Sequence, residues 1–132
     1  MKVLIVEDDF ISRKILKEIL TPYGECDIAI DGREAITAFR MAYEEGACYD
    51  LICMDVIMPN MDGQQALKVI RTFEKQSGVC ETDEVKIFMI TALGDPKTVV
   101  EALYRGGANS YLVKPISKQK LLHELRNFGL IQ

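Results

Sequence analysis

The sequence predicts an α/β fold in which five parallel strands form a doubly wound sheet with helices on both faces. Three observations lead to this prediction. Short apolar runs alternate with amphipathic stretches along all 132 residues, as in right-handed strand–helix–strand units. The apolar runs are nearly continuous, as expected of parallel strands buried on both sides. Turn and capping residues separate the two kinds of segment.

The first strand and the first helix are expected at Lys2–Val6 and Phe10–Leu20. β-Branched residues favour the strand. In the helix, apolar residues recur at helical spacing and should form one buried face: Ile11, Ile15, Leu16, Ile19 and Leu20. Thr21-Pro22 and Gly24 then end the helix.

The second strand is expected at Cys26–Ile30. Asp31 can cap the next helix, and Glu34 follows three residues later, as in a capping box. That helix should stop near Gly46, and the third strand is expected at Tyr49–Met54.

A third helix can begin at Asp62, and its apolar positions are Leu67, Ile70 and Phe73. The polar, acidic stretch Ser77–Glu84 is expected to be a solvated loop. The fourth strand follows at Lys86–Ile90.

The dipeptide Asp95-Pro96 predicts the start of a fourth helix, with an acid at the cap and proline in the first turn, and Gly106-Gly107 marks its end. Ser110–Val113 is the expected fifth strand. Ser117 can cap the last helix, whose apolar residues are Leu121, Leu122, Leu125 and Phe128. We find no repeat or linker, so residues 1–132 are expected to form a single domain.

Composition excludes several classes of protein. The net charge is −4 and the basic residues are scattered, which argues against a nucleic-acid surface. No stretch approaches the roughly 18 apolar residues of a membrane span, and the N-terminus does not resemble a signal peptide. The four cysteines lack metal-binding spacing, so we expect reduced, buried thiols in a cytoplasmic protein.

The residues that directly follow four of the strands are polar: Glu7, Asp8, Asp9, Asp55, Thr91 and Lys114. The carboxyl ends of parallel strands meet at one edge of a sheet, so these side chains should gather in one crevice. Each residue alone has an ordinary explanation, and Asp9 is best explained as a helix cap. The set as a whole indicates a functional site.

Carboxylates that share a crevice repel each other unless a cation joins them. Oxygen ligands favour a hard divalent ion, and Mg²⁺ is the expected one. A carboxylate beside Mg²⁺ and a lysine is suited to attack a phosphoryl group, which gives Asp55 a chemical role. Lys114 can neutralise charge on the phosphoryl oxygens, and Thr91 can donate a hydrogen bond to one of them.

Four motifs give the chain a resemblance to response-regulator receiver domains over essentially its full length: VEDD at 6–9, MDVIMPNMDG at 54–63, ITA at 90–92 and SYLVKP at 110–115. Each motif alone is weak, but their order and spacing together are specific. The resemblance implies a flavodoxin-like fold with strand order 2-1-3-4-5.

The resemblance implies that Asp55 accepts a phosphoryl group from a sensor histidine kinase or a His phosphotransfer protein. Asp8 would bind Mg²⁺ directly and Glu7 through water. Asp55 and the backbone carbonyl of Ile57 would complete the metal site. The domain would thus support its own phosphorylation and autodephosphorylation as a signalling domain, without being an enzyme.

Further roles follow from the same resemblance. Lys114 would bind the phosphoryl group, Thr91 would act as the switch hydroxyl, and Tyr111 would swing inward with it. A downstream protein would then bind the face formed by helix 4, strand 5 and helix 5. Ile57 and Leu93 occupy positions that flank the route of hydrolytic water in this family. Both are apolar here, so either the phosphoryl-aspartate is long-lived or both side chains simply pack.

With no effector domain in the sequence, we expect a stand-alone, monomeric receiver with chemotaxis-type output or a phosphorelay role, or else a piece of a longer regulator. Three alternatives remain. A dehalogenase-type phosphatase would need an aspartate where Ile57 stands. A degenerate receiver would bind partners without phosphorylation. A flavodoxin-like nucleotide-binding protein would need a phosphate loop where VEDDFIS stands.

Overall fold

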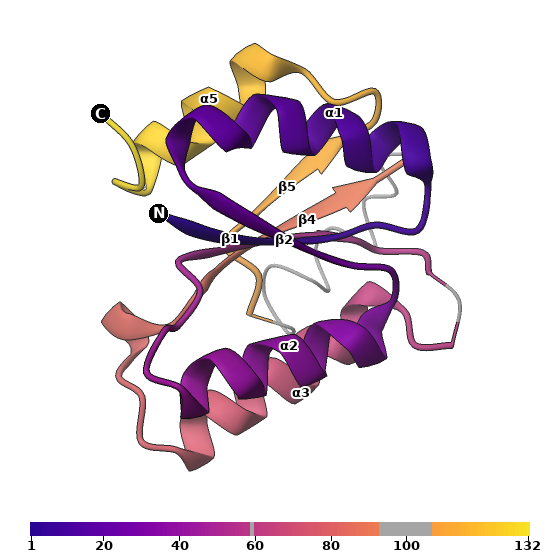
Figure 1. Ribbon diagram of the computed structural model, residues 1–132. Helices are drawn as coiled ribbons and strands as arrows, with labels where there is room; N and C mark the ends of the chain where they lie inside the picture. Colours follow the sequence, from indigo (N-terminus) through magenta and orange to yellow (C-terminus); the bar gives the residue numbers. More distant parts are fainter. Residues whose placement is uncertain (59, 93–106) are drawn as a thin grey trace.

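Figure 1 shows a computed structural model of the chain, which describes residues 1–58, 60–92 and 107–132. Its strands are β1 (Lys2–Val6), β2 (Glu25–Ala29), β3 (Leu51–Asp55), β4 (Lys86–Thr91) and β5 (Ser110–Val113). Its described helices are α1 (Phe10–Leu20), α2 (Gly32–Glu44), α3 (Gly63–Gln76) and α5 (Lys118–Asn127). None of these helices is long and apolar enough to cross a lipid bilayer. The helix expected from Asp95 to Gly106 lies outside the described residues.

All five strands are parallel and pair in the order β2-β1-β3-β4-β5, so the predicted fold class and strand order are confirmed. Helices α1 and α5 cover one face of the sheet, and α2 and α3 cover the other (Figure 1). Alternate strand residues feed the two cores. Leu4 and Ile52 pack on the α2–α3 side, whereas Val3 and Leu51 pack on the α1–α5 side.

Each described α-helix begins at a predicted capping residue. The side chains of Asp9, Asp31, Asp62 and Ser117 each accept a hydrogen bond from the backbone N–H three residues later. These bonds satisfy N–H groups that would otherwise lack a partner in the first turn. For Asp9, the bond from the Ser12 N–H confirms the prediction that this acid is a helix cap.

The predicted apolar face of α1 is partly wrong. Leu16, Ile19 and Leu20 are buried, but Ile11 and Ile15 are exposed. At roughly 100° per residue, Ile11 lies roughly 140° and Ile15 roughly 100° around the helix from Leu16. Both side chains therefore lie beyond the stripe that contacts the sheet.

Several predicted boundaries differ from the observed ones by one or two residues. Pairing with Lys2 starts β2 at Glu25 rather than at Cys26. Asp55 and Thr91 are the last paired residues of β3 and β4, although their polarity suggested that they follow the strands. The expected loop Ser77–Glu84 contains a short 3₁₀ turn. Hydrogen bonding across the sheet therefore continues one residue past the apolar pattern.

The prediction of buried cysteines holds for only part of the set. Cys53 is fully buried in β3, and Cys26 is half-buried. Cys48 and Cys80 are exposed. The exposed pair lies in the connections that lead into β3 and β4. Burial raises the pKa of the Cys53 thiol to about 12, so this thiol stays protonated near neutral pH.

Candidate functional site

The candidate site lies at the carboxyl edge of the sheet, where β1 and β3 end side by side. Val6 pairs with Met54 across these strands, so the next residues, Glu7 and Asp55, also lie next to each other. The N–H of Glu7 donates to the carbonyl of Ala29, which continues the pairing of β1 with β2 by one residue. Strand register therefore brings together two acids that are 48 positions apart in the sequence.

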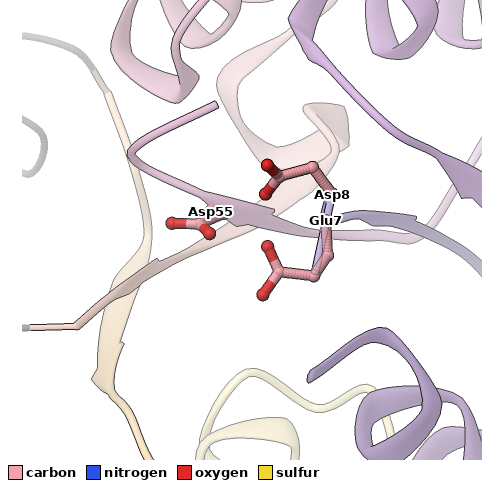
Figure 2. Close-up of side chains that lie close together, drawn as sticks. All are labelled: Glu7, Asp8 and Asp55. Atoms are coloured by element: carbon pink, nitrogen blue, oxygen red, sulfur yellow. The ribbon is translucent and has the colours of Figure 1, made fainter. Parts of the chain in front are cut away.

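Three carboxylates meet at this edge (Figure 2). One oxygen each from Glu7, Asp8 and Asp55 lies within 4.8 Å of the other two. Glu7 is only 1% exposed and Asp55 only 7% exposed, whereas Asp8 faces solvent. Negative charge is thus concentrated in a partly desolvated cluster, in which Asp8 is the exposed member.

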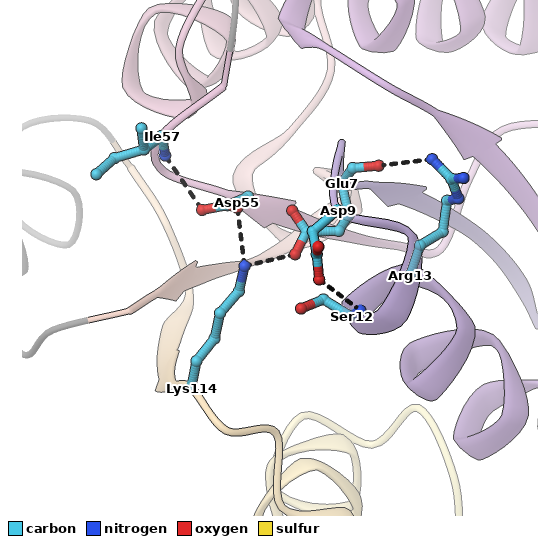
Figure 3. A network of polar contacts seen from close by, with 7 residues as sticks. All are labelled: Glu7, Asp9, Ser12, Arg13, Asp55, Ile57 and Lys114. Atoms are coloured by element: carbon cyan, nitrogen blue, oxygen red, sulfur yellow. Dashed lines mark hydrogen bonds and ion pairs between the residues drawn. The ribbon is translucent and has the colours of Figure 1, made fainter.

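Lys114 reaches into the crevice from the end of β5 (Figure 3). Its Nζ lies 2.5 Å from Glu7 Oε1 and 3.0 Å from Asp55 Oδ2. The backbone N–H of Lys114 donates to the carbonyl of Thr91, which fixes the residue directly beside β4. Although burial works against the charged form, the contacts with Glu7 and Asp55 raise the pKa of Lys114. The side chain is therefore a permanent cation at neutral pH.

The two oxygens of Asp55 have different partners. Asp55 Oδ2 accepts from Lys114, and Asp55 Oδ1 accepts from the backbone N–H of Ile57 at 3.1 Å. These two bonds fix the rotation of the carboxylate (Figure 3). The side chain of Ile57 points away from the core and is 75% exposed.

Lys114 alone does not satisfy the carboxylates of this site, as the surroundings of Glu7 show. Within the described part of the chain, Glu7 Oε2 is buried and has no hydrogen-bond partner. Burial and the contact with Asp55 raise the pKa of Glu7 to about 7, although Lys114 acts in the opposite direction. A buried, unpartnered carboxylate oxygen beside two further carboxylates suits a hard divalent cation. The residues present therefore fit Mg²⁺.

Of the other predicted site residues, Thr91 lies near Asp55, whereas Tyr111 points outward. Thr91 is buried at the end of β4, next to the β3 end that carries Asp55. Tyr111 lies on β5 with a side chain that is 41% exposed, so it is in an outward position. Leu93 lies outside the described residues.

Two contacts at the site were missed by reasoning from the sequence. Arg13 Nη1, from α1, donates to the backbone carbonyl of Glu7 at 3.3 Å, and no role at the site was predicted for Arg13. Asp31 was assigned only a capping role, yet its second carboxylate oxygen accepts from the side-chain amide of Asn60 at 2.9 Å. No local pattern signals either contact, because each joins separate elements of the fold.

Comparison with known families agrees with this geometry. The family model described as response regulator receiver domain matches residues 3–126. The chain belongs to this family. Receiver domains are signalling domains of two-component systems and bind Mg²⁺ at an acidic pocket. This receiver domain has an acidic group at Glu7, Asp8 and Asp55.

Two curated relatives illustrate the range of proteins that contain such a domain. The receiver domain is 36% identical to the chemotaxis protein CheY of Treponema pallidum, over 94% of this chain and 79% of the relative. It is 33% identical to the osmosensing histidine protein kinase SLN1 of Saccharomyces cerevisiae, over 97% of this chain and only 10% of the kinase. The chain thus spans most of one relative and a small part of the other.

Two solved structures are similar over nearly the whole chain. CheY in the CheX–CheY–BeF3–Mg²⁺ complex from Borrelia burgdorferi is one comparison, with 30% identity, a TM-score of 0.83, and coverage of 100% of this chain and 90% of the matched chain. The other is the co-crystal structure of Ypd1, a histidine phosphotransfer protein, with the receiver domain of Ssk1 from Saccharomyces cerevisiae. That match has 34% identity, a TM-score of 0.84, and coverage of 98% and 88%.

Proposed function

We propose that this domain is a Mg²⁺-dependent phosphoacceptor that receives a phosphoryl group on Asp55. The observation that carries the proposal is the setting of the Asp55 carboxylate. It is nearly buried, its two oxygens are fixed by Lys114 and the Ile57 N–H, and two further acids stand beside it. A carboxylate with fixed orientation next to a cation is suited to be a nucleophile toward phosphorus.

In the proposed transfer, an oxygen of Asp55 attacks the phosphorus of a phosphohistidine. An O–P bond forms while the P–N bond breaks, and the histidine nitrogen keeps the electron pair of the broken bond. The ammonium of Lys114 stabilises negative charge on the phosphoryl oxygens. Thr91, at the neighbouring strand end, donates a hydrogen bond to one of them. Glu7, Asp8, Asp55 and the Ile57 carbonyl would hold Mg²⁺, which would supply further positive charge to the phosphoryl group.

The proposed phosphoryl donor is a sensor histidine kinase or a His phosphotransfer protein. The similarity to a receiver domain crystallised with Ypd1 supports this class of partner. Exposed apolar side chains lie close to the acids in the sequence: Phe10 and Ile11 follow Asp8, and Ile57 follows Asp55. Exposed apolar surface near the site also favours a protein partner.

The proposed output is a phosphorylation-dependent contact with a downstream protein. A cleft of about 600 Å³ lies between β5 and α5 and is lined in part by Tyr111, Lys120 and His123. This cleft supports binding of the downstream protein on the face that β5 and α5 form. Thr91 and Tyr111 act as the switch that couples the face to Asp55, by shifting the populations of two conformations. We propose a single, monomeric receiver domain over residues 1–132 that acts in the cytoplasm, without nucleic-acid or membrane partners.

Incubation with acetyl phosphate tests the proposal. Intact-protein mass should rise by one phosphoryl group in the presence of Mg²⁺, and the Asp55→Asn variant should show no rise. Chelation of Mg²⁺ should prevent the gain in the unmodified protein. Absence of any gain, with Mg²⁺ binding shown separately, would instead identify a module that binds partners without phosphorylation.

We further propose that hydrolysis of the phosphoryl-aspartate is slow because Ile57 and Leu93 are apolar. The exposed Ile57 side chain offers no polar group to orient an attacking water, and its exposure argues against a packing role. The double variant Ile57→Asn, Leu93→Glu should therefore lose its phosphoryl group severalfold faster, measured as the decay of the phosphorylated mass. Ile57→Leu should decay like the unmodified protein. Equal decay of all three proteins would contradict this proposal.

A further inference from the structure

The connection from β3 to α3 carries the Ile57 N–H, and it is attached to the start of α2. The side-chain amide of Asn60 donates to Asp31 Oδ2 at 2.9 Å. One residue further along each segment, the N–H of Gly32 donates to the carbonyl of Met61 at 3.2 Å. Two adjacent bonds thus hold the β3–α3 connection against the first turn of α2.

Asp31 is suited to hold both segments at once. Its Oδ1 accepts from the Glu34 N–H at 2.9 Å and caps α2, which leaves Oδ2 for Asn60. The residue is only 7% exposed. The Glu34 N–H and the Asn60 amide hold the pKa of Asp31 below its usual range. A bond to this ionised, shielded carboxylate is stronger than a bond between neutral groups.

The backbone of both segments is adapted to this contact. Asn60 has a φ of 66°, in the left-handed region that asparagine and glycine tolerate best. A Cβ at Gly32 would lie 2.7 Å from the Met61 carbonyl oxygen, so only glycine allows the close approach.

Two backbone bonds restrain the ends of the connection, and one of them joins it to β4. The Val56 N–H donates to the carbonyl of Ile90, and the Gly63 N–H donates to the carbonyl of Val56. These bonds restrain Val56 and Gly63 at the two ends, and the contacts with α2 restrain Asn60 and Met61. Ile57 lies between the two sets of restraints, and its N–H donates to Asp55 Oδ1.

We infer that Asp31 and Asn60 are positioning residues for the phosphoacceptor, because together they hold the Ile57 N–H against Asp55. This inference rests on the proposed function of Asp55. We call the pair the Asp31–Asn60 clamp. Without it, the Asp55 carboxylate would lose the fixed orientation that aligns it for attack on phosphorus.

Two single variants remove the clamp with little other change. Asn60→Gly keeps the left-handed backbone but removes the amide. Asp31→Ser keeps a capping oxygen for Glu34 but is too short to reach Asn60. Each should slow phosphorylation by acetyl phosphate at saturating Mg²⁺ by about tenfold. The double variant should be no slower than either single variant, because all three lack the same bond.

A reversed pair and a matched control separate positioning from general loss of stability. Asp31→Asn combined with Asn60→Asp exchanges donor and acceptor and should restore the rate. Glu34→Ala removes the bond that Glu34 accepts from the Ile30 N–H, so it weakens the start of α2 while leaving the clamp in place. This control should melt at a lower temperature and yet be phosphorylated at the unmodified rate. Equal slowing in Glu34→Ala, or additive effects in the double variant, would overturn the inference.

Hydrogen exchange at the Ile57 amide tests the clamp when no phosphoryl donor is present. Exchange measured by NMR should be faster in Asn60→Gly and Asp31→Ser than in the unmodified protein and the reversed pair. Unchanged exchange would overturn the clamp even if the domain is phosphorylated. Failure of the unmodified protein to gain a phosphoryl group would count against the proposed function, and the exchange measurement would still decide whether the clamp positions Ile57.

Discussion

The Glu74→Ala variant should unfold with a free energy about 3–5 kcal/mol lower than that of the unmodified protein. Glu74 is buried in α3, and both of its oxygens are bonded. Oε1 accepts from Arg71 Nη1 at 2.6 Å, and Oε2 accepts from the buried N–H of Val85 at 2.8 Å. Removing the carboxylate leaves a guanidinium without its counter-charge and a backbone N–H without a partner.

The same network explains why the effect should be large. Arg71 also donates to the Gly107 carbonyl and to the Asn109 side chain, which in turn accepts from the N–H of Ile87. These bonds attach the segment that leads into β5 to α3 and β4. Because Lys114 stands at the end of β5, the network also helps to set the position of the crevice lysine.

Urea unfolding followed by circular dichroism would measure the change. Glu74→Gln keeps an acceptor for Val85 and should lose only about 1 kcal/mol. Glu44→Ala removes an exposed carboxylate from α2 and should change stability by less than about 0.5 kcal/mol. A Glu74→Ala protein as stable as the Glu44→Ala control would refute the account of this network.

The Lys114→Ala variant should be phosphorylated by acetyl phosphate about 10²–10³-fold more slowly than the unmodified protein. Lys114 is the cation that contacts both Glu7 and Asp55, so its loss leaves two buried carboxylates facing each other. Repulsion between these two carboxylates would disturb the orientation of Asp55 for attack on phosphorus. The phosphoryl oxygens would also lose a counter-charge.

Rates of mass gain at saturating Mg²⁺ would measure this effect. Lys114→Arg keeps the charge but not the compact ammonium, so it should recover only part of the rate. Lys75→Ala removes an exposed lysine of α3 and should leave the rate unchanged. A Lys114→Ala protein within about threefold of the unmodified rate would show that Lys114 is not the group that stabilises the transferred phosphoryl oxygens.

Features that depend on local pattern could be predicted from the sequence. The strands were found from apolar runs, and the caps at Asp9, Asp31, Asp62 and Ser117 from residue type and spacing. The gathering of Glu7, Asp8, Asp55 and Lys114 followed from one rule, that parallel strands end at the same edge of the sheet. The roles of these residues in phosphoryl transfer stay predictions.

Side-chain contacts between separate elements, away from the shared edge of the strands, could not be predicted. Ile15 matches an amphipathic pattern, but the sheet contacts only the narrower stripe through Leu16. The bond between Asp31 and Asn60 joins residues 29 positions apart, and that between Arg71 and Asn109 joins residues 38 apart. Each of these side chains taken alone reads as an ordinary cap, loop or surface residue.

The most direct test of the central claim is to locate the phosphoryl group. The domain would be phosphorylated with acetyl phosphate and Mg²⁺, reduced with borohydride, and digested for peptide mass analysis. Reduction converts an aspartyl phosphate to homoserine, so homoserine is expected at position 55 and the side chains of Glu7 and Asp8 should be unmodified. Reduction at Glu7 or Asp8, or a phosphoryl group that resists borohydride on another residue, would contradict the assignment of Asp55 as the phosphoacceptor.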